Sequence, residues 1–133
     1  MCNVEAACEI GWAEKPWPDD CPPSNAKNTT NEVMFRLVTT IPPTETDFLS
    51  RRALNPEQHL TDHSECTNVA LSIWTTPQSC ASARKFTTLK HKLIGQIALK
   101  PGAGVTRRRQ KQHFSWWRCG AFDAIKNTSP VAE

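Results

Sequence analysis

The sequence contains no tyrosine, only five glycines among its 133 residues, and no long apolar run. Without tyrosine, no candidate site can use a phenolic hydroxyl as an acid or as a hydrogen-bond donor. No segment approaches the ~20 apolar residues that a membrane-spanning helix needs, and residues 1–12 lack the basic and apolar parts of a secretory signal. Six cysteines would suggest disulfides in a small secreted chain. Because no signal is visible, we expect a cytoplasmic protein with mostly reduced thiols and no membrane contact.

The common cofactor, metal and catalytic motifs are also missing. The segment PGAG at residues 101–104 precedes strand-like residues and lacks GK[ST], so it is neither a phosphate-binding loop nor a dinucleotide fingerprint. The segment closest to a metal site is a polar one that holds His59, Asp62, His63, Glu65 and Cys66. No second closely spaced ligand pair completes a zinc site, so we expect a solvated loop and no metal. No nucleophile signature is recognisable, which favours a protein without catalysis and without a cofactor.

Acidic residues are missing from a long C-terminal span. From Lys85 to Arg118, with both ends counted, there are nine lysines and arginines and no aspartate or glutamate. After this span the only acids are Asp123 and the terminal Glu133, so an active site here would have to borrow a carboxylate. Residues 1–32, in contrast, carry more acidic than basic side chains. The basic span must therefore face solvent, an acidic partner, or the acidic segment of its own chain.

Hydrophobic periodicity and turn residues predict an alternating order of short elements. The expected strands are 33–40, 69–74, 93–100 and 112–118, and the expected helices are 45–53 and 77–89. Residues 105–109 fit a further strand or a loop. This order indicates an α+β domain in which two short helices pack on a small mixed or antiparallel sheet. We expect a single domain at 33–126, after an irregular proline-rich N-terminal arm at 1–32 and before a frayed tail at 127–133.

The basic span also contains the aromatic strand HFSWW. Arginine and lysine can contact phosphates, and aromatic rings can stack on bases. Alternation along this strand places Phe114 and Trp116 on one face, which we expect to be core. The sequence therefore predicts a small binding protein whose basic C-terminal hairpin meets an anionic partner, either nucleic acid or an acidic protein surface. The residues expected to make this contact are Arg107, Arg108, Arg109, Lys111, His113 and Trp117.

A resemblance suggests a second function. The order FRLVTTIPPTETDFLS, VALSIWTT, LIGQIAL and HFSWW resembles a group of small uncharacterised bacterial proteins. It is also similar to compact ADP-ribosyltransferase-like toxin domains, in which a first-strand arginine and a central-strand serine help to hold NAD. The resemblance implies these roles for Arg36 and Ser72. Those transferases also use a late glutamate or a tyrosine, and neither has a counterpart in the matching region, so the implied alternative is an NAD-binding domain with or without activity.

Overall fold

The computed structural model describes residues 12–13, 18, 21–60, 64–85 and 92–131. Within these residues all paired strands are antiparallel and form one sheet in the order β1-β5-β6-β3-β2-β4-β7. The strands are β1 (Lys27–Asn28), β2 (Glu32–Val38), β3 (Leu71–Trp74), β4 (Leu93–Leu99), β5 (Gly104–Gln110), β6 (His113–Arg118) and β7 (Thr128–Pro130). The predicted α+β class with a small antiparallel sheet is confirmed.

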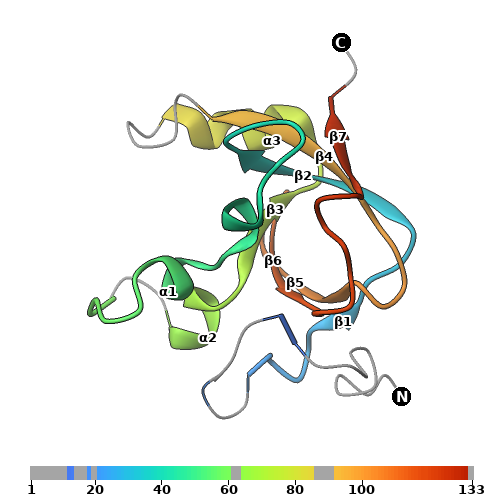
Figure 1. Cartoon of the computed structure of the whole chain (residues 1–133). Helices are drawn as coiled ribbons and strands as arrows, with labels where there is room; N and C mark the ends of the chain where they lie inside the picture. The colour runs from blue at the N-terminus through green and yellow to red at the C-terminus, as the bar shows by residue number, and fades with distance from the viewer. Residues whose placement is uncertain (1–11, 14–17, 19–20, 61–63, 86–91, 132–133) are drawn as a thin grey trace.

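The sheet is strongly curled, so that its strands run around a central space that side chains fill (Figure 1). Inside the curl, Trp116 is fully buried and its indole Nε1 donates to the Ala103 carbonyl at 3.2 Å. Phe122 packs edge-on against this ring, with the ring centroids 5.9 Å apart. The main core comprises Met34, Phe48, Leu71, Ile73, Ile97, Leu99, Ala103, Trp116 and Ala124.

The outer face of the sheet is covered at two places. The helix α3 (Pro77–Ser82) and the 3-10 turn η3 (Ala83–Lys85) lie against one of them, where Cys80 packs on Phe35 and Leu37. At the other, Val105 of β5 and Trp117 of β6 pack with Ala26, Val69 and Ala70. The short helices α1 (Arg51–Leu54) and α2 (Glu65–Asn68) form a lobe beside the sheet (Figure 1).

The start of α3 follows its local sequence signal. Thr76 caps the helix, because its side chain accepts a hydrogen bond from the Ser79 amide, and Pro77 occupies the first turn where its missing N–H costs nothing. The predicted helix at 77–89 is therefore confirmed over Pro77–Lys85. The rest of that prediction lies outside the described residues.

The helix predicted at 45–53 is interrupted. Residues Glu45–Phe48 form the 3-10 turn η2, Leu49 is extended, and Ser50 caps the separate helix α1 by accepting from the Ala53 amide. The physical reason is a competing hydrogen-bond network. The Asp47 carboxylate accepts from the Thr39 amide and hydroxyl, which ties the first turn to the end of β2.

The frayed tail expected at 127–133 was wrong for Thr128–Pro130. These residues form β7 and pair with β4, where Gly95 lies opposite Pro130. Part of the N-terminal arm also joins the sheet, because Lys27–Asn28 pairs with β5. Residues 105–109, left open as strand or loop, belong to β5, which pairs with β6 as a hairpin.

The expectation of mostly reduced thiols was wrong for one pair. Cys21 and Cys66 form a disulfide that links the N-terminal segment to α2. Trp117 supports this link, because its indole Nε1 donates to the Cys66 carbonyl at 3.0 Å. Cys80 and Cys119 are both buried. None of the helices in the described part of the chain has the length and apolar character needed to cross a bilayer.

Candidate functional site

The basic run lies on the β5–β6 hairpin and reaches solvent. Arg107, Arg108, Arg109 and Lys111 are all exposed. Arg107 lies opposite Ser115, and the next residue, Arg108, points to the other face of the strand. There its guanidinium carbon lies 5.8 Å from the centre of the Phe114 ring, a cation–π geometry that holds the side chain at the rim of the core.

The positive charge of this hairpin is not neutralised by the described acids. Among the residues that the structure describes, the ion pairs are Arg52–Glu65 and Arg118–Glu45, and none involves Arg107, Arg108 or Lys111. Most acids of the N-terminal arm, which could have covered the hairpin, lie outside the described residues. We name the exposed set Arg107, Arg108 and Lys111 the basic hairpin.

The first of two clefts lies between the hairpin turn and α3, and its volume is about 510 Å³. Trp74 and His113, register partners on β3 and β6, form its floor. Their rings are stacked, with centroids 4.7 Å apart and planes within 8°. Lys85 and Lys111 add positive charge at its edges. We call this cleft the stacking groove; it is lined by Trp74, Ser79, Ser82, Ala83, Lys85, Gln110, Lys111, Gln112 and His113.

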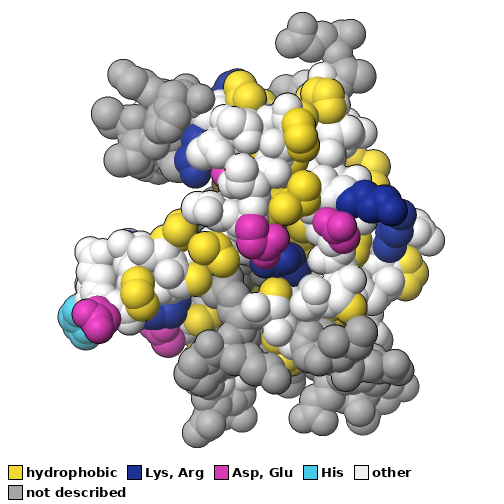
Figure 2. All heavy atoms as spheres, viewed as in Figure 1, with side chains coloured by type: hydrophobic (Ala, Val, Ile, Leu, Met, Phe, Trp, Pro, Cys, Tyr) yellow, Lys and Arg dark blue, Asp and Glu magenta, His cyan; other side chains and the backbone are white. Residues whose placement is uncertain are grey.

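The second cleft, of about 280 Å³, lies where the α1–α2 lobe meets the sheet. Figure 2 shows this lobe projecting at the lower left, with a notch in the surface above it. Three arginines from separate elements line the cleft: Arg36 from β2, Arg51 from α1 and Arg109 from β5. We call it the arginine pocket; its other lining residues are Leu49, Ser50, Leu54, Asn55, Thr67, Asn68, Ala70, Leu71 and Ser72.

Arg36 is the arginine that the sequence places inside an apolar strand. Its Nη1 donates to the Ser72 carbonyl at 2.7 Å, and its Nε donates to the Asp47 carbonyl at 2.9 Å. The β2 and β3 strands pair only at Phe35 and Trp74, so the guanidinium bridges them where the ladder is open. The structure thus brings Arg36 and Ser72 together, although through the main chain of Ser72.

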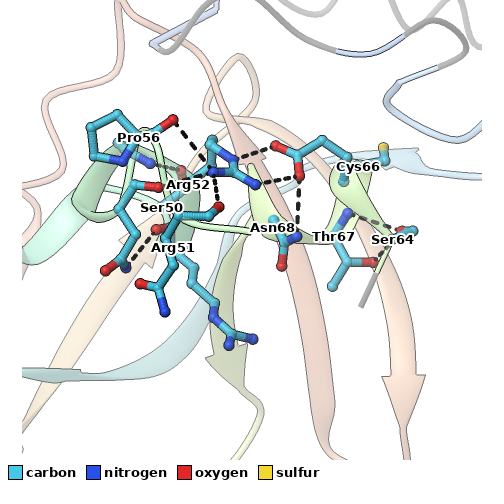
Figure 3. Close-up of polar contacts among 12 residues, drawn as sticks. Ser50, Arg51, Arg52, Pro56, Ser64, Cys66, Thr67 and Asn68 are labelled. Carbon is cyan, nitrogen blue, oxygen red and sulfur yellow. Dashed lines mark hydrogen bonds and ion pairs between the residues drawn. The ribbon is translucent and has the colours of Figure 1, made fainter. Parts of the chain in front are cut away.

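An ion pair fixes the lobe above the arginine pocket. Arg52 binds Glu65 through two bonds, Nε to Oε2 at 2.6 Å and Nη2 to Oε1 at 2.9 Å (Figure 3). The Asn68 side-chain amide donates to the same carboxylate at 3.2 Å. Arg51 extends away from this pair in the figure, so consecutive arginines serve different purposes. One holds α1 to α2, and the other lines the pocket.

The described lining of both clefts includes basic side chains. No aspartate or glutamate is found among the described residues that line either cleft. Partial desolvation lowers the pKa of the Arg109 guanidinium, but an arginine remains charged at neutral pH. Burial raises the pKa of the Cys80 thiol to about 12, despite the nearby Arg36 and Arg84. Cys80 is therefore a core residue and not a thiolate nucleophile.

One of the sequence-predicted site residues lies differently from expectation. Trp117 was expected to meet the partner, but it is 2% exposed and packs beneath the disulfide segment. In the polar segment, Glu65 pairs with Arg52 and Cys66 is in the disulfide. Its Asp62 and His63 lie outside the described residues. Within the described chain, no three His, Cys, Asp or Glu side chains cluster as metal ligands.

Sequence reasoning missed the residues that complete the two clefts. Trp74 was treated as part of a strand, and Arg51, Lys85 and Asn68 were not singled out. For Trp74 a signal existed, because alternation places it on the same face of β3 as the polar Ser72.

Comparison with protein-family models, with curated proteins and with solved structures finds no match for this chain.

Proposed function

We propose that this protein binds single-stranded nucleic acid, with a base in the stacking groove and the phosphate backbone on the basic hairpin. The observation that carries the proposal is the Trp74–His113 stack in a groove edged by Lys85 and Lys111. Sequence-tolerant binding of single strands combines such aromatic platforms with positive charge along the backbone path. Each base stacked on an aromatic ring contributes about 1–3 kcal/mol to such complexes.

The groove favours nucleic acid over an acidic protein surface. An acidic protein surface would need cations alone, whereas this groove also presents a stacked aromatic pair, Trp74 and His113, on which a base can stack. Its volume of about 510 Å³ falls within the ~300–1,000 Å³ range of small-ligand clefts, so one nucleotide is a suitable occupant. Duplex is a poor occupant, because its bases are paired and stacked on one another and cannot reach the floor.

The basic hairpin lies next to the groove along the same strands. Arg107 is opposite Ser115, two residues along β6 from His113, or about 7 Å at the usual strand rise. Lys111 belongs to both the hairpin turn and the groove lining. A strand with one base on the floor therefore has its neighbouring phosphates within reach of Arg107 and Lys111.

The test is fluorescence anisotropy with a labelled single-stranded oligoribonucleotide at several salt concentrations. The variant Arg107→Gln/Arg108→Gln/Lys111→Gln leaves Arg109 in place, so that the arginine pocket is intact. We expect its affinity to fall by about tenfold or more, and the salt slope to shrink by about 2, since each phosphate contact contributes about 0.7. The control, Lys100→Gln/Lys126→Gln, removes two exposed charges that do not belong to the hairpin and should bind as the wild type does.

Two results would contradict the proposal. One is equal binding by the hairpin variant and its control. The other is binding of polyglutamate as tightly as RNA, which would indicate an acidic protein surface as the partner.

The alternative function is an NAD-binding domain of the ADP-ribosyltransferase type. Arg36 and Ser72 are adjacent, which favours it, but the residues that line their pocket supply no carboxylate in the described chain. Titration calorimetry with NAD separates the two functions. Heat of binding that Arg36→Gln abolishes and the hairpin variant leaves unchanged would favour the alternative.

A further inference from the structure

The stacking groove has two walls of different composition. On one side lies the hairpin turn with Lys111, and on the other lies η3, which follows α3 and carries Lys85. The floor between them is the Trp74–His113 stack. In the proposed function, on which this inference rests, the phosphate backbone follows the hairpin side. A base that projects from this backbone across the floor therefore turns the edge farthest from its sugar toward Lys85.

Lys85 faces the groove without an accompanying carboxylate in the described lining. That lining contains no aspartate or glutamate, and none of the ion pairs between described residues involves Lys85. Residues 86–91, which follow Lys85 in the sequence, contain no acidic residue either. An ammonium group donates up to three hydrogen bonds and accepts none. This wall of the groove therefore favours a base edge that carries acceptors.

Ser82 stands beside Lys85 and has the opposite hydrogen-bonding character. The two residues are three apart at the junction of α3 and η3, a spacing that places side chains on the same side of a helical turn, and both line the groove. The Ser82 hydroxyl donates its only proton to the Gln78 carbonyl at 3.1 Å. Its oxygen can therefore only accept from a ligand. The wall thus offers a charged donor next to a neutral acceptor.

Guanine is the base whose far edge fits this wall best. Its O6 and N7 atoms are adjacent acceptors, and donation by one lysine or arginine to both is the commonest base-specific contact in protein–DNA complexes. The N1–H group beside O6 is a donor that the Ser82 oxygen can accept. Adenine places an amino group, which is a donor, where guanine has O6, so the amino group would meet the Lys85 ammonium. Uracil has a carbonyl at this position but no counterpart of N7.

We propose that the stacking groove selects guanine, and that the Lys85 ammonium donates to its O6 and N7 atoms. Ser82 Oγ accepts from the guanine N1–H group, the Trp74–His113 stack supports the ring, and the basic hairpin holds the neighbouring phosphates. The protein then binds guanine-containing single strands in preference to strands that offer only adenine or cytosine. Single strands are the suitable ligand, because these base edges are free of pairing.

Fluorescence anisotropy tests the selectivity with a labelled oligocytidine RNA that carries one other base at its centre. The central base is guanine, adenine, uracil or 7-deazaguanine, which lacks the N7 acceptor. We expect the guanine strand to bind about tenfold more tightly than the adenine strand, which is within the discrimination of one bidentate base contact. The uracil and 7-deazaguanine strands should fall between these two, since each keeps the carbonyl but lacks N7.

Variants of Lys85 show whether its ammonium causes the selectivity. Lys85→Gln replaces the cation by an amide that can accept as well as donate, so it should remove the preference for guanine over adenine. Lys85→Arg should keep the preference, because arginine also donates to O6 and N7. Lys126→Gln, which removes an exposed charge outside the groove lining, should keep it too. Lys85 is exposed, so we expect its variants to fold as the wild type does.

The hairpin variant Arg107→Gln/Arg108→Gln/Lys111→Gln separates guanine selection from RNA binding itself. It should weaken binding of every strand and still prefer guanine over adenine. Equal affinity of the wild type for the guanine and adenine strands would overturn guanine selection, although RNA binding would stand. A guanine preference that persists in Lys85→Gln would overturn the role of Lys85. No binding of any strand by the wild type would overturn the proposed function and guanine selection together.

Discussion

Trp74 and His113 lie opposite each other on β3 and β6, and their rings stack with 4.7 Å between centroids and 8° between planes. The stack forms the floor of a groove edged by two lysines. Neither residue is a close neighbour of the other in the sequence. Their contact follows from the register of two antiparallel strands, and it places a stacked aromatic pair beside the most basic segment of the protein.

The first prediction concerns this stack. We expect His113→Ala and Trp74→Ala each to weaken binding of single-stranded RNA by about 5- to 150-fold, which corresponds to about 1–3 kcal/mol for one base–aromatic contact. Fluorescence anisotropy at constant salt measures the loss. His59→Ala, which changes an exposed histidine elsewhere, is the matched control. Unchanged affinity in both stack variants would exclude the groove as a base site.

The second prediction concerns Asp47, which is 5% exposed. Burial raises the pKa of its carboxyl, but the hydrogen bonds from Thr44 and Thr39 together lower it by more than burial raises it. The pKa of Asp47 therefore lies below the ordinary 3.8. Because the folded-state pKa lies below the unfolded-state value, the ionised carboxylate stabilises the folded protein above pH 3.8. This stabilisation is lost as the pH falls through the folded-state pKa. Asp47→Asn should therefore lower the free energy of unfolding by about 1–3 kcal/mol at pH 7.

Urea unfolding at pH 7 and near pH 3 measures this effect. The deficit of Asp47→Asn relative to the wild type should shrink at the lower pH, because the stabilisation by the ionised carboxylate declines once the pH falls below the unfolded-state pKa of 3.8. Glu57→Gln, an exposed neutralisation, should have little effect at either pH. A deficit in unfolding free energy of the same size at both pH values would mean that the ionised form of Asp47 contributes nothing to stability.

The third prediction concerns the disulfide between Cys21 and Cys66, which are 45 residues apart. Closing a loop of this length in the unfolded chain contributes about 4 kcal/mol by the chain-entropy model. Cys21→Ser/Cys66→Ser should lower the thermal midpoint, and reductant should lower that of the wild type but not that of the variant. Alkylation of the denatured, unreduced protein should leave both cysteines unmodified. Modification of either one would contradict the link.

The fourth prediction concerns Gly104, the first residue of β5. Its φ is +142°, and a Cβ added there would lie 2.1 Å from the Trp117 carbonyl oxygen. Gly104→Ala combines backbone strain with overpacking, and we expect it to cost about 2–4 kcal/mol of stability. Gly102→Ala is the control: its φ is +89° but the space around it is open, so strain alone, about 1–2 kcal/mol, applies. Equal thermal midpoints for the two variants would contradict this account.

Much of the fold could be predicted from local patterns. Alternation correctly placed Phe114 and Trp116 on the core face of β6, and the Thr76–Pro77 pair correctly marked the start of α3. These signals are short-range, since side-chain period and helix capping depend on residues within one or two turns. Local patterns failed for β7, whose three residues become a strand only because the edge of β4 is available to pair with them.

The candidate site, like the fold, could be predicted from local sequence patterns only in part. Exposure of Arg107, Arg108 and Lys111 follows from a basic run too charged to be buried, and this much the amino-acid order determined by itself. Alternation does not tell which part of the outer face is covered by other segments. It therefore predicted an exposed Trp117, whereas the disulfide segment buries this side chain. The Trp74–His113 stack and the meeting of three arginines were decided only by tertiary structure. Strand register and the placement of the α1–α2 lobe are long-range properties, and they bring together residues that no local pattern connects.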